Sequence, residues 1–426
     1  MKRYLVLLAI IAAVLPLRAD ISLDECQRLA RENYPLIRQY GLLQRTRDID
    51  LSDINKSWLP RVEVYAQGTV QNAVPSFPDE LRSMLTQMGQ SFDGLNKFQY
   101  KGGVELAQTI WDGGESKARR EQARARTAAG EARLDVELYG IRQRVQNLYF
   151  SRLLLDSQIE TTRASIALLD SNITELNSLL RGGVAIPADV AMVKAERLSM
   201  AQKLVEAESQ RDALTEMLGV FTGRNLAAEK FLLPDASLPA DTANLRPEQQ
   251  LFSRQLELNS AMRRSVKASL MPKIGLFGSA YYGYPGLDYF KSMRDKKPTF
   301  NALAGVKISW NLGSLYQRDN TLRRLDISDE SILSDRDVFD FNIRLQTRQE
   351  MKEIEGLRKV VENDAEIVAL RAEVRQTAES QLRHGIIDPL QLTVKINDEN
   401  RARLTQSYNR ISLIQKIYNL KNTLNR

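Results

Sequence analysis

Residues 134–180 decide the fold of this chain, and they read LDVELYGIRQ RVQNLYFSRL LLDSQIETTR ASIALLDSNI TELNSLL. Apolar residues recur there in alternating steps of four and three, and only Arg152 and Thr162 interrupt them. A period of 3.5 residues sustained over this length indicates a long helix in left-handed coiled-coil packing against its neighbours. We call this series the apolar seam: Leu134, Leu138, Ile141, Val145, Leu148, Arg152, Leu155, Ile159, Thr162, Ile166, Leu169, Ile173, Leu176 and Leu180.

The apolar seam lies in the outward arm of a predicted helical hairpin. A helix over residues 115–180 is about 99 Å long at 1.5 Å per residue. It ends at the Arg-Gly-Gly of residues 181–183, where glycine can take the positive φ of a helix C-terminus. Pro187 suits the first turn of a returning helix, which stops near residues 219–223, about half the outward length.

A helix over residues 22–57 supplies the other half if the two short helices stack end to end. Ser22 and Glu25 have the spacing of a capping box at its start. The second half of the chain repeats this plan, with a long helix over about 315–382 and a return over about 389–423.

Short motifs recur at constant offsets and predict an internal duplication. Pro35 and Pro60 recur as Pro247 and Pro272, in each case 212 residues later. The motifs that recur 202 residues later are Gly103-Val104-Glu105-Leu106, as Gly305-Val306-Lys307-Ile308, and Arg181-Gly182-Gly183-Val184, as Arg383-His384-Gly385-Ile386. We therefore expect a signal peptide over residues 1–19, a first structural repeat over 20–235 and a second over 236–426.

Each repeat contains two candidate strands, at 62–70, 100–110, 274–284 and 300–310. Their lengths suit tilted transmembrane strands, and apolar and polar residues alternate along them. Aromatic residues gather at both levels: Trp58, Trp111 and Trp310 at one, and Tyr100, Tyr284 and Phe300 at the other. A soluble antiparallel sheet with one wet face shares this alternation, so the period alone leaves both alternatives open.

Composition and the N-terminus restrict the classes of function. A single Cys and a single His exclude a disulfide scaffold and a Cys or His zinc site within one chain. Lys and Arg exceed Asp and Glu by only 60 to 53 and are scattered, so no nucleic-acid partner is expected. Lys2 and Arg3 precede an apolar run over residues 4–14, as in a secretory signal peptide.

The chain resembles the TolC-like outer-membrane efflux protein family, the outer membrane factors of tripartite efflux or type I secretion systems. The resemblance rests on the order of linked features: the signal peptide, Trp58-Leu59-Pro60 and Leu270-Met271-Pro272 before strands, Gly113 and Gly313 after strands, Arg246-Pro247-Glu248, and the two Arg-x-Gly tips. It implies a mostly α fold with a small β part, in which long coiled-coil hairpins form a periplasmic α-barrel. Four strands per chain would contribute to a trimeric, 12-stranded outer-membrane β-barrel.

The resemblance also implies a function and partners. The chain would be the exit duct in the outer membrane of a Gram-negative bacterium. It would pass substrates to the exterior from an inner-membrane efflux pump or ABC transporter, with which a periplasmic adaptor (membrane fusion protein) connects it. Outer-membrane lipid would surround the barrel, and no cofactor is implied.

The need for an oligomer also follows from physical reasoning, independently of the resemblance. Four strands cannot close a barrel, and open sheet edges are not tolerated in lipid, so several chains must contribute. Two chains give eight strands and a filled interior, whereas three give twelve and leave room for a channel.

The hairpin tips are the candidate functional site. We expect adaptor contacts at Arg181, Gly182, Gly183, Val184, Arg383, His384, Gly385 and Ile386. In the family, side chains just inside the second tip close the pore, and TolC itself carries acidic residues six and nine positions after the tip glycine. Gln391 and Val394 occupy those positions here, so closure is expected to use them, with any cation preference coming from Asp189 or Asp388.

Two other classes of protein, a periplasmic coiled-coil protein and an enzyme, fit parts of the sequence. A periplasmic coiled-coil adaptor, or a structural protein of an envelope complex, would also carry coiled-coil hairpins, but it needs no strands with aromatic ends. An enzyme is disfavoured because His384, the only imidazole, lies at a helical tip. The exported compound and the cognate pump leave no signature in the sequence.

Overall fold

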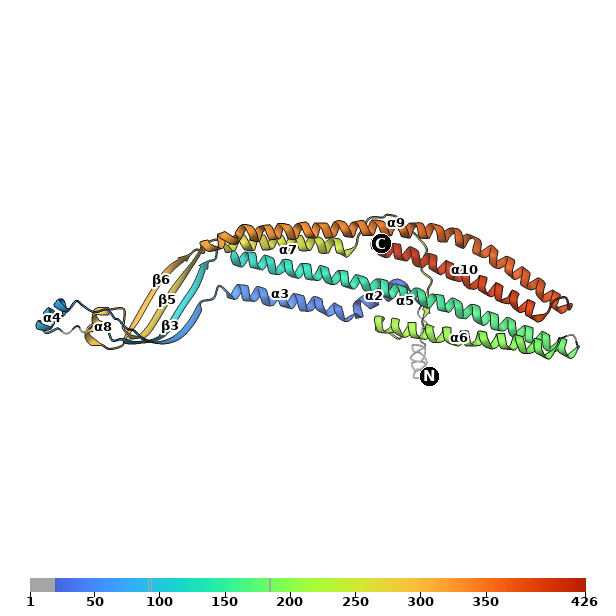
Figure 1. The fold of residues 1–426 in the computed structure, drawn as a ribbon, viewed down its shortest axis with the longest axis horizontal. Helices are drawn as coiled ribbons and strands as arrows, with labels where there is room; N and C mark the ends of the chain where they lie inside the picture. Colours follow the sequence, from blue (N-terminus) through green and yellow to red (C-terminus); the bar gives the residue numbers. More distant parts are fainter. Residues whose placement is uncertain (1–19, 91, 93, 184) are drawn as a thin grey trace, which may run out of the picture. The chain divides into compact units, whose positions relative to one another are not determined.

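The structure is a computed structural model that describes residues 20–90, 92, 94–183 and 185–426 (Figure 1). The predicted signal peptide, residues 1–19, lies outside the described residues. Two compact units are present: a helical unit built from residues up to 41, 131–251 and 334–426, and a strand unit built from 42–130 and 252–333. Across the described parts of the chain, we find no helix with the length and apolar character needed to cross a bilayer.

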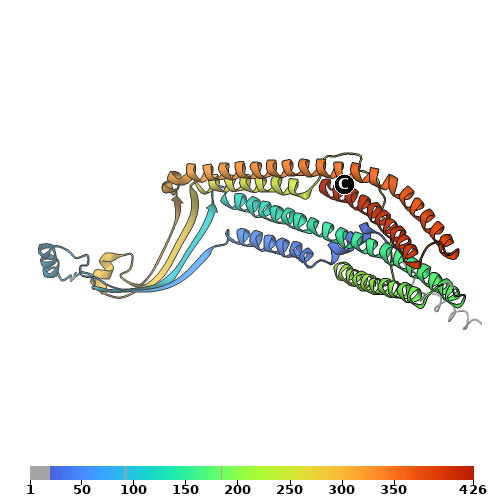
Figure 2. The same ribbon diagram turned by 45° about the vertical axis from the view of Figure 1, so that its right-hand side comes forward.

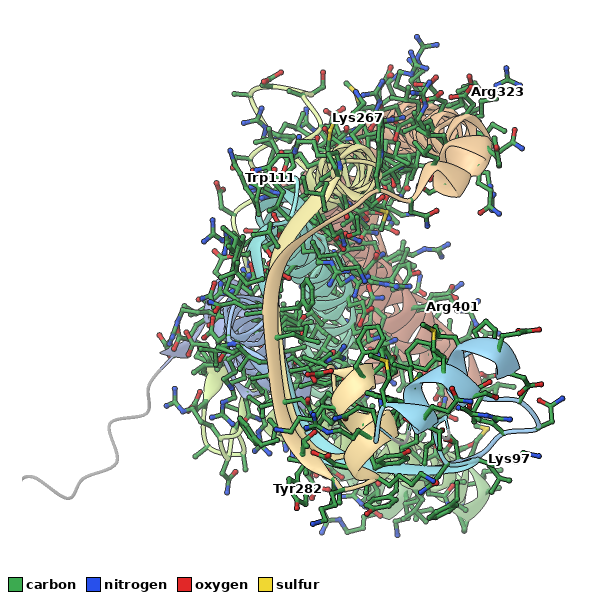
Figure 3. All side chains as sticks on the ribbon, turned by 90° about the vertical axis from the view of Figure 1, so that its left-hand side faces the viewer. Lys97, Trp111, Lys267, Tyr282, Arg323 and Arg401 are labelled. Carbon is green, nitrogen blue, oxygen red and sulfur yellow. The ribbon has the colours of Figure 1, made fainter. Side chains whose placement is uncertain are left out.

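The strand unit contains a four-stranded antiparallel sheet in the order β2-β3-β5-β6. The strands are β2 (Arg61–Val70), β3 (Phe98–Trp111), β5 (Lys273–Tyr284) and β6 (Thr299–Ser309). They run side by side, with Trp111 and Tyr282 at opposite ends (Figures 2 and 3). Each predicted strand is present, with ends that differ by up to two residues.

Pairing between strands gives the sheet one apolar and one polar face. Val64 lies opposite Val104, which lies opposite Ala280, and Ala280 lies opposite Ala302. One position along, Glu63 lies opposite Glu105. Because side chains alternate between faces, the in-register pairing sorts apolar and charged residues onto opposite sides.

The repeated strand glycines lie opposite aromatic residues of β5. Gly103 is paired with Tyr281 and Gly305 with Phe277. A Cβ added to Gly103 would lie 2.6 Å from the Tyr281 Cβ, and one added to Gly305 would lie 2.8 Å from the Phe277 ring. Glycine therefore leaves room for the neighbouring strand, for its backbone and the Tyr281 Cβ at Gly103 and for the Phe277 ring at Gly305.

The connections between paired strands contain two short helices that the sequence did not predict. They are α4 (Asp79–Gln87), between β2 and β3, and α8 (Tyr289–Asp295), between β5 and β6. Leu95, Tyr284 and Met293 form a small core there, and the Asn96 N–H donates to the Tyr284 hydroxyl at 2.9 Å. Tyr284 lies level with Tyr100, as predicted, but it is buried under these connections rather than exposed at a membrane surface.

Long hairpins make up the helical part of the fold, as predicted. Their arms are α5 (Glu115–Arg181) with α6 (Pro187–Thr222), and α9 (Leu315–Arg383) with α10 (Pro389–Leu424). The helix α7 (Pro247–Ser269) precedes β5. The short 3-10 turn η2 (Leu312–Ser314) precedes α9.

The prediction of one helix over residues 22–57 is wrong. The segment consists of α2 (Leu23–Asn33), the 3-10 turn η1 (Pro35–Ile37) and α3 (Arg38–Lys56). Tyr34 is extended, with φ −66° and ψ 130°. Pro35 explains the break, because proline disfavours helical geometry in the preceding residue and has no N–H to donate. The N-terminal prediction holds in part, since the Glu25 N–H donates to the Ser22 Oγ at 3.2 Å.

The apolar seam of α5 is turned inward, and none of its residues is exposed. Arg152, one of its two interruptions, is buried and donates from Nε to the Thr215 hydroxyl of α6 at 2.9 Å. Its guanidinium lies 5.0 Å from the centre of the Phe231 ring. This cation is tolerated in the seam because a hydroxyl, an aromatic face and the Asp156 carboxylate, with which it forms an ion pair, lie around it.

A second core in the helical unit holds the segment that begins at Asp20. Tyr149 is fully buried, and its hydroxyl lies 2.8 Å from the Ile21 carbonyl oxygen and 2.6 Å from that of Leu232. It thereby joins β1 (Asp20–Ile21) to the segment after β4 (Lys230–Phe231), with which β1 pairs in parallel. Cys26 packs in the same core, and burial raises the pKa of its thiol to about 12.

We predict that Gly103→Val destabilises the sheet, because its side chain overlaps Tyr281, whereas Gly102→Val is tolerated. A Cβ at Gly102 meets only the Tyr65 carbonyl oxygen, at 3.7 Å. Overpacking of this kind costs about 1–3 kcal/mol, so Gly103→Val should lower the melting temperature in detergent, followed by circular dichroism, by several degrees relative to Gly102→Val. Equal melting temperatures for the two variants would contradict this account of the repeated glycine.

Candidate functional site

The first tip joins α5 to α6 in a tight turn. Gly183 has φ +76°, and its N–H donates to the Leu180 carbonyl oxygen at 3.1 Å. At the start of α6 the Asp189 carboxylate accepts from the Ile186 N–H at 3.0 Å. Asp189 therefore has a local partner in the cap of α6. Val184, a predicted contact residue, lies outside the described residues.

The second tip repeats the turn between α9 and α10. Gly385 has φ +69°, and its N–H donates to the Leu382 carbonyl oxygen at 3.0 Å. Asp388 is the N-cap of α10 and accepts from the Gln391 N–H at 2.8 Å. His384 lies 2.7 Å, through Nδ1, from the Ser380 carbonyl oxygen, so it acts as a helix-end side chain.

Both tip glycines are required by backbone geometry. Their positive φ angles are strained for other residues, whereas a Cβ at either position would meet nothing within 4 Å. The space outside each turn is therefore open within the chain, and a larger side chain would project into it.

The two tips are held together at one end of the helical unit (Figure 1). A shared core includes Leu176 of α5, Val193 of α6, Leu382 of α9 and Ile396 of α10. Polar contacts reinforce the core. Arg383 pairs with Glu175 at 3.4 Å, the Asn397 amide donates to Glu196 at 3.1 Å, and Arg197 pairs with Asp170 at 3.1 Å. The tips thus present one composite surface.

Most predicted contact residues are exposed on that surface: Arg181, Gly182, Gly183, Arg383, His384, Gly385 and Ile386. Ile386 is 69 % exposed. Sequence reasoning missed Ile186, 59 % exposed, and Leu390, which is also exposed. The signal in the sequence is an apolar residue beside the proline that starts the returning helix. It indicates an exposed contact only after the positions that face the core have been identified.

The predicted pore-entrance residues divide between the two hairpins. Asp388, Gln391 and Val394 share the first turns of α10 and are exposed, and a hydrogen bond links the first two. Asp189 lies at the start of α6 and is partly buried. A single chain therefore offers one exposed carboxylate beside an amide and an apolar side chain.

The architecture of paired long hairpins and a four-stranded sheet is that of known outer-membrane channels. It is similar to the outer membrane protein VceC from Vibrio cholerae, with a TM-score of 0.67, 14 % identity, and coverage of 94 % of this chain and 95 % of that one. The Campylobacter jejuni outer membrane channel CmeC has a TM-score of 0.64 and 14 % identity, covering 94 % of this chain and 85 % of that one. The open-state MtrE channel of Neisseria gonorrhoeae has a TM-score of 0.63 and 14 % identity, covering 94 % of this chain and 88 % of that one.

At these identities the likeness establishes the fold alone. Residues 28–224 match the family model described as outer membrane efflux protein. Over these residues the chain is similar to the outer membrane efflux protein family. No curated protein sequence matches it.

The Asp388 cap should stabilise the first turns of α10, and hydrogen exchange can measure this local stability. Asp388→Ala removes the acceptor of the Gln391 N–H, which costs about 0.5–2 kcal/mol at an N-cap, whereas Asp388→Asn keeps an acceptor. Hydrogen exchange of the peptide that covers the first turns of α10 should accelerate in the alanine variant only. Acceleration in both variants, or in neither, would contradict the capping role.

Proposed function

We propose that this chain is the outer-membrane exit duct of a tripartite efflux or type I secretion system, working as a homotrimer. One observation carries the proposal: the sheet has an apolar face and two free edges, β2 and β6. Backbone groups on a free edge cannot remain unpaired in lipid. An antiparallel contact between β2 of one copy and β6 of the next removes both edges at once.

The number of copies follows from the space inside the barrel. Three copies contribute twelve strands, enough to leave an aqueous interior, whereas eight strands enclose only side chains. The charged face, which carries Glu63 and Glu105, would then line the water-filled side, and the face with Val64 and Val104 would meet lipid.

Exposed apolar residues at seven-residue spacing support the same assembly in the helical unit. Val360, Ile367 and Val374 recur on α9, and Leu198 and Val205 recur on α6. Each series lies on a helix face that this chain leaves uncovered. A 3.5-residue period on an exposed face is typical of a helix that packs against another chain.

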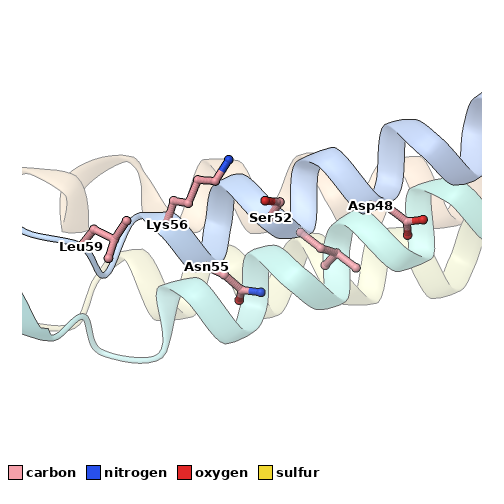
Figure 4. A pocket seen from close by; sticks show the side chains of 6 residues that line it. Asp48, Ser52, Asn55, Lys56 and Leu59 are labelled. Atoms are coloured by element: carbon pink, nitrogen blue, oxygen red, sulfur yellow. The ribbon is translucent and has the colours of Figure 1, made fainter.

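The strand unit carries a further uncovered helix surface. A groove of about 450 Å³ follows α3 and is lined by Asp48, Leu51, Ser52, Asn55, Lys56 and Leu59 (Figure 4). Leu42 and Ile49, seven residues apart on the same helix, are exposed as well. We assign this surface to a helix of the adjacent copy, which would continue the coiled-coil packing.

The remaining partners follow from the proposed location. The helical hairpins extend into the periplasm of a Gram-negative bacterium after removal of residues 1–19, and outer-membrane lipid surrounds the sheet. The joined tips contact a periplasmic adaptor, which connects the duct to an inner-membrane efflux pump or ABC transporter. The exposed Ile186 and Ile386 support a protein contact there, because isolated turns need no apolar surface.

The two-repeat organisation is also proposed, with repeats over residues 20–235 and 236–426. The order of elements supports it, since each half contains a helix, a strand pair and a long hairpin. A periplasmic adaptor, the alternative function, is disfavoured because it has no use for a sheet with an apolar face and free edges.

We propose that the periplasmic entrance narrows at the first turns of α10. Gln391 and Val394 would meet their copies around the threefold axis, through amide hydrogen bonds and apolar contact. Asp388, one turn nearer the tip, would supply a ring of negative charge, with Asp189 as the second candidate.

Trimer assembly should depend on the exposed apolar face of α9. Ile367→Asp combined with Val374→Asp places charges where a neighbouring helix would pack, so native mass spectrometry in detergent should show loss of the trimer. Glu366→Gln, an exposed change beside the stripe, should leave it intact. A monomeric wild-type chain, or a trimer that survives both aspartates, would refute the proposed assembly.

The ion selectivity of the channel should show whether Asp388 lines the entrance. Asp388→Asn keeps the cap but removes the charge, so planar-bilayer recordings of the trimer should show a smaller cation preference, and Asp388→Glu should restore it. Unchanged reversal potentials for Asp388→Asn and for Asp189→Asn would exclude both carboxylates from the constriction.

A further inference from the structure

A polar pocket on the helical unit is not explained by trimer assembly or by the tips. It has a volume of about 430 Å³ and lies between α9 and α10. Its walls carry three amides, two carboxylates, one ammonium group and one leucine: Asn342, Leu345, Gln346, Gln349, Glu350, Glu353 and Lys416.

Glu350 is the unusual member of this pocket. Its side chain is buried, since the residue is only 8 % exposed. One carboxylate oxygen, Oε1, accepts from the Gln346 amide at 3.0 Å and from the Thr423 hydroxyl at 3.1 Å. The other oxygen, Oε2, is buried and has no hydrogen-bond partner in the part of the chain that the structure describes. An unpartnered buried carboxylate oxygen is costly, because water is lost and nothing replaces it.

The nearby cation is already engaged. Lys416 of α10 donates from Nζ to Glu353 at 2.5 Å, and Gln349 donates to the same carboxylate at 2.8 Å. This pairing lowers the pKa of Glu353, through the Lys416 hydrogen bond first. The pocket therefore contains two carboxylates and one cation, and the carboxylate without a cation is the buried one.

Burial controls the protonation of Glu350. Desolvation raises its pKa above the ordinary value of a glutamate, and it outweighs the hydrogen bonds from Gln346 and Thr423 and the attraction of Lys416. The neighbouring charge of Glu353 raises the pKa further. A cation placed at Oε2 would reverse this balance, because it stabilises the ionised form that burial disfavours.

The chemistry of the pocket selects the kind of cation. Among the described residues, no group of three or more His, Cys, Asp or Glu side chains is arranged to hold a metal ion. Oε2 lacks a hydrogen-bond donor, which an N–H group of a cation can supply, and the amides of Asn342 and Gln349 offer carbonyl oxygens for further N–H groups. Leu345 supplies an apolar wall against which a short alkyl chain can pack.

We propose that this pocket binds a small organic cation with N–H groups, an alkylammonium or guanidinium compound, through the Oε2 of Glu350. The ligand donates to Oε2 and to the amide oxygens, while its alkyl part covers Leu345. Lys416 stays paired with Glu353, which keeps it from occupying the site itself.

The experiment uses the assembled wild-type protein in detergent at low ionic strength, with 1,4-diaminobutane as the probe in isothermal titration calorimetry. We expect one site per chain. Glu350→Gln should weaken binding at least tenfold, because a neutral amide of the same shape replaces the carboxylate. Glu355→Gln is the matched control: it removes an exposed carboxylate from the same helix, one that pairs with Lys352 at 2.7 Å, and should leave the affinity unchanged.

Two further measurements keep the result specific. Tetramethylammonium, which has no N–H, should bind at least tenfold more weakly than the diamine. Binding to the wild type should weaken as the pH falls through the raised pKa of Glu350, because protons compete with the ligand for Oε2, and Glu350→Gln should lose that dependence.

The contrary outcomes are equally clear. Equal affinity of Glu350→Gln and wild type, equal loss in Glu355→Gln, or no diamine binding at millimolar concentration would overturn the proposal. Native mass spectrometry of Glu350→Gln should give the same mass as the wild type, because the pocket lies within one chain. An unchanged mass shows that a change in diamine binding does not come from loss of the trimer.

Discussion

Unpaired backbone groups along β2 and β6 are the constraint on which the rest of the structure depends. Both strands form edges of the sheet, and the sheet carries valines and alanines on one face. A chain that exposes an apolar sheet face and two free edges is not a finished folding unit, because each edge is a row of unsatisfied donors and acceptors. The same incompleteness recurs on α6 and α9, where exposed apolar residues lie seven positions apart. The similarity of residues 28–224 to outer membrane efflux proteins and the physical need for closure therefore both support the proposed assembly.

Some buried polar groups of the helical unit have hydrogen-bond or ion-pair partners, and others have none among the described residues. Arg152 interrupts the apolar seam, but Thr215 and the Phe231 ring receive its guanidinium. Glu350 is comparably buried on α9 and lines a pocket, and its Oε2 has no hydrogen-bond partner among the described residues. Arg152 Nη1 also lacks a hydrogen-bond partner among the described residues, but the guanidinium forms an ion pair with Asp156. Glu350 has no such ion pair among the described residues and lines a pocket, and this difference is the physical basis for treating only Glu350 as part of a binding site.

The tips illustrate how structural and functional roles share residues. Gly183 and Gly385 are needed for the positive φ of each turn, and Asp388 caps α10 whether or not it lines a pore. What the turns do not need is the exposed apolar side chains of Ile186 and Ile386. The proposed contact with another protein would account for them, and their cost in water is modest because they are small patches.

The sequence by itself determined the elements of this protein. A 3.5-residue period, a two-residue alternation and glycines of positive φ are local signals, so the long hairpins, the four strands and both tips could be predicted from neighbouring residues alone. Even the break at Pro35 is a local signal, because proline disfavours helical geometry in the residue before it. Only the tertiary structure decided which residues meet across elements. The pairing of Gly103 with Tyr281, the burial of Tyr284 and the isolation of Glu350 beside Lys416 depend on strand register and helix packing. Those contacts join residues tens to almost two hundred positions apart in the chain, and no periodicity in a single segment encodes them.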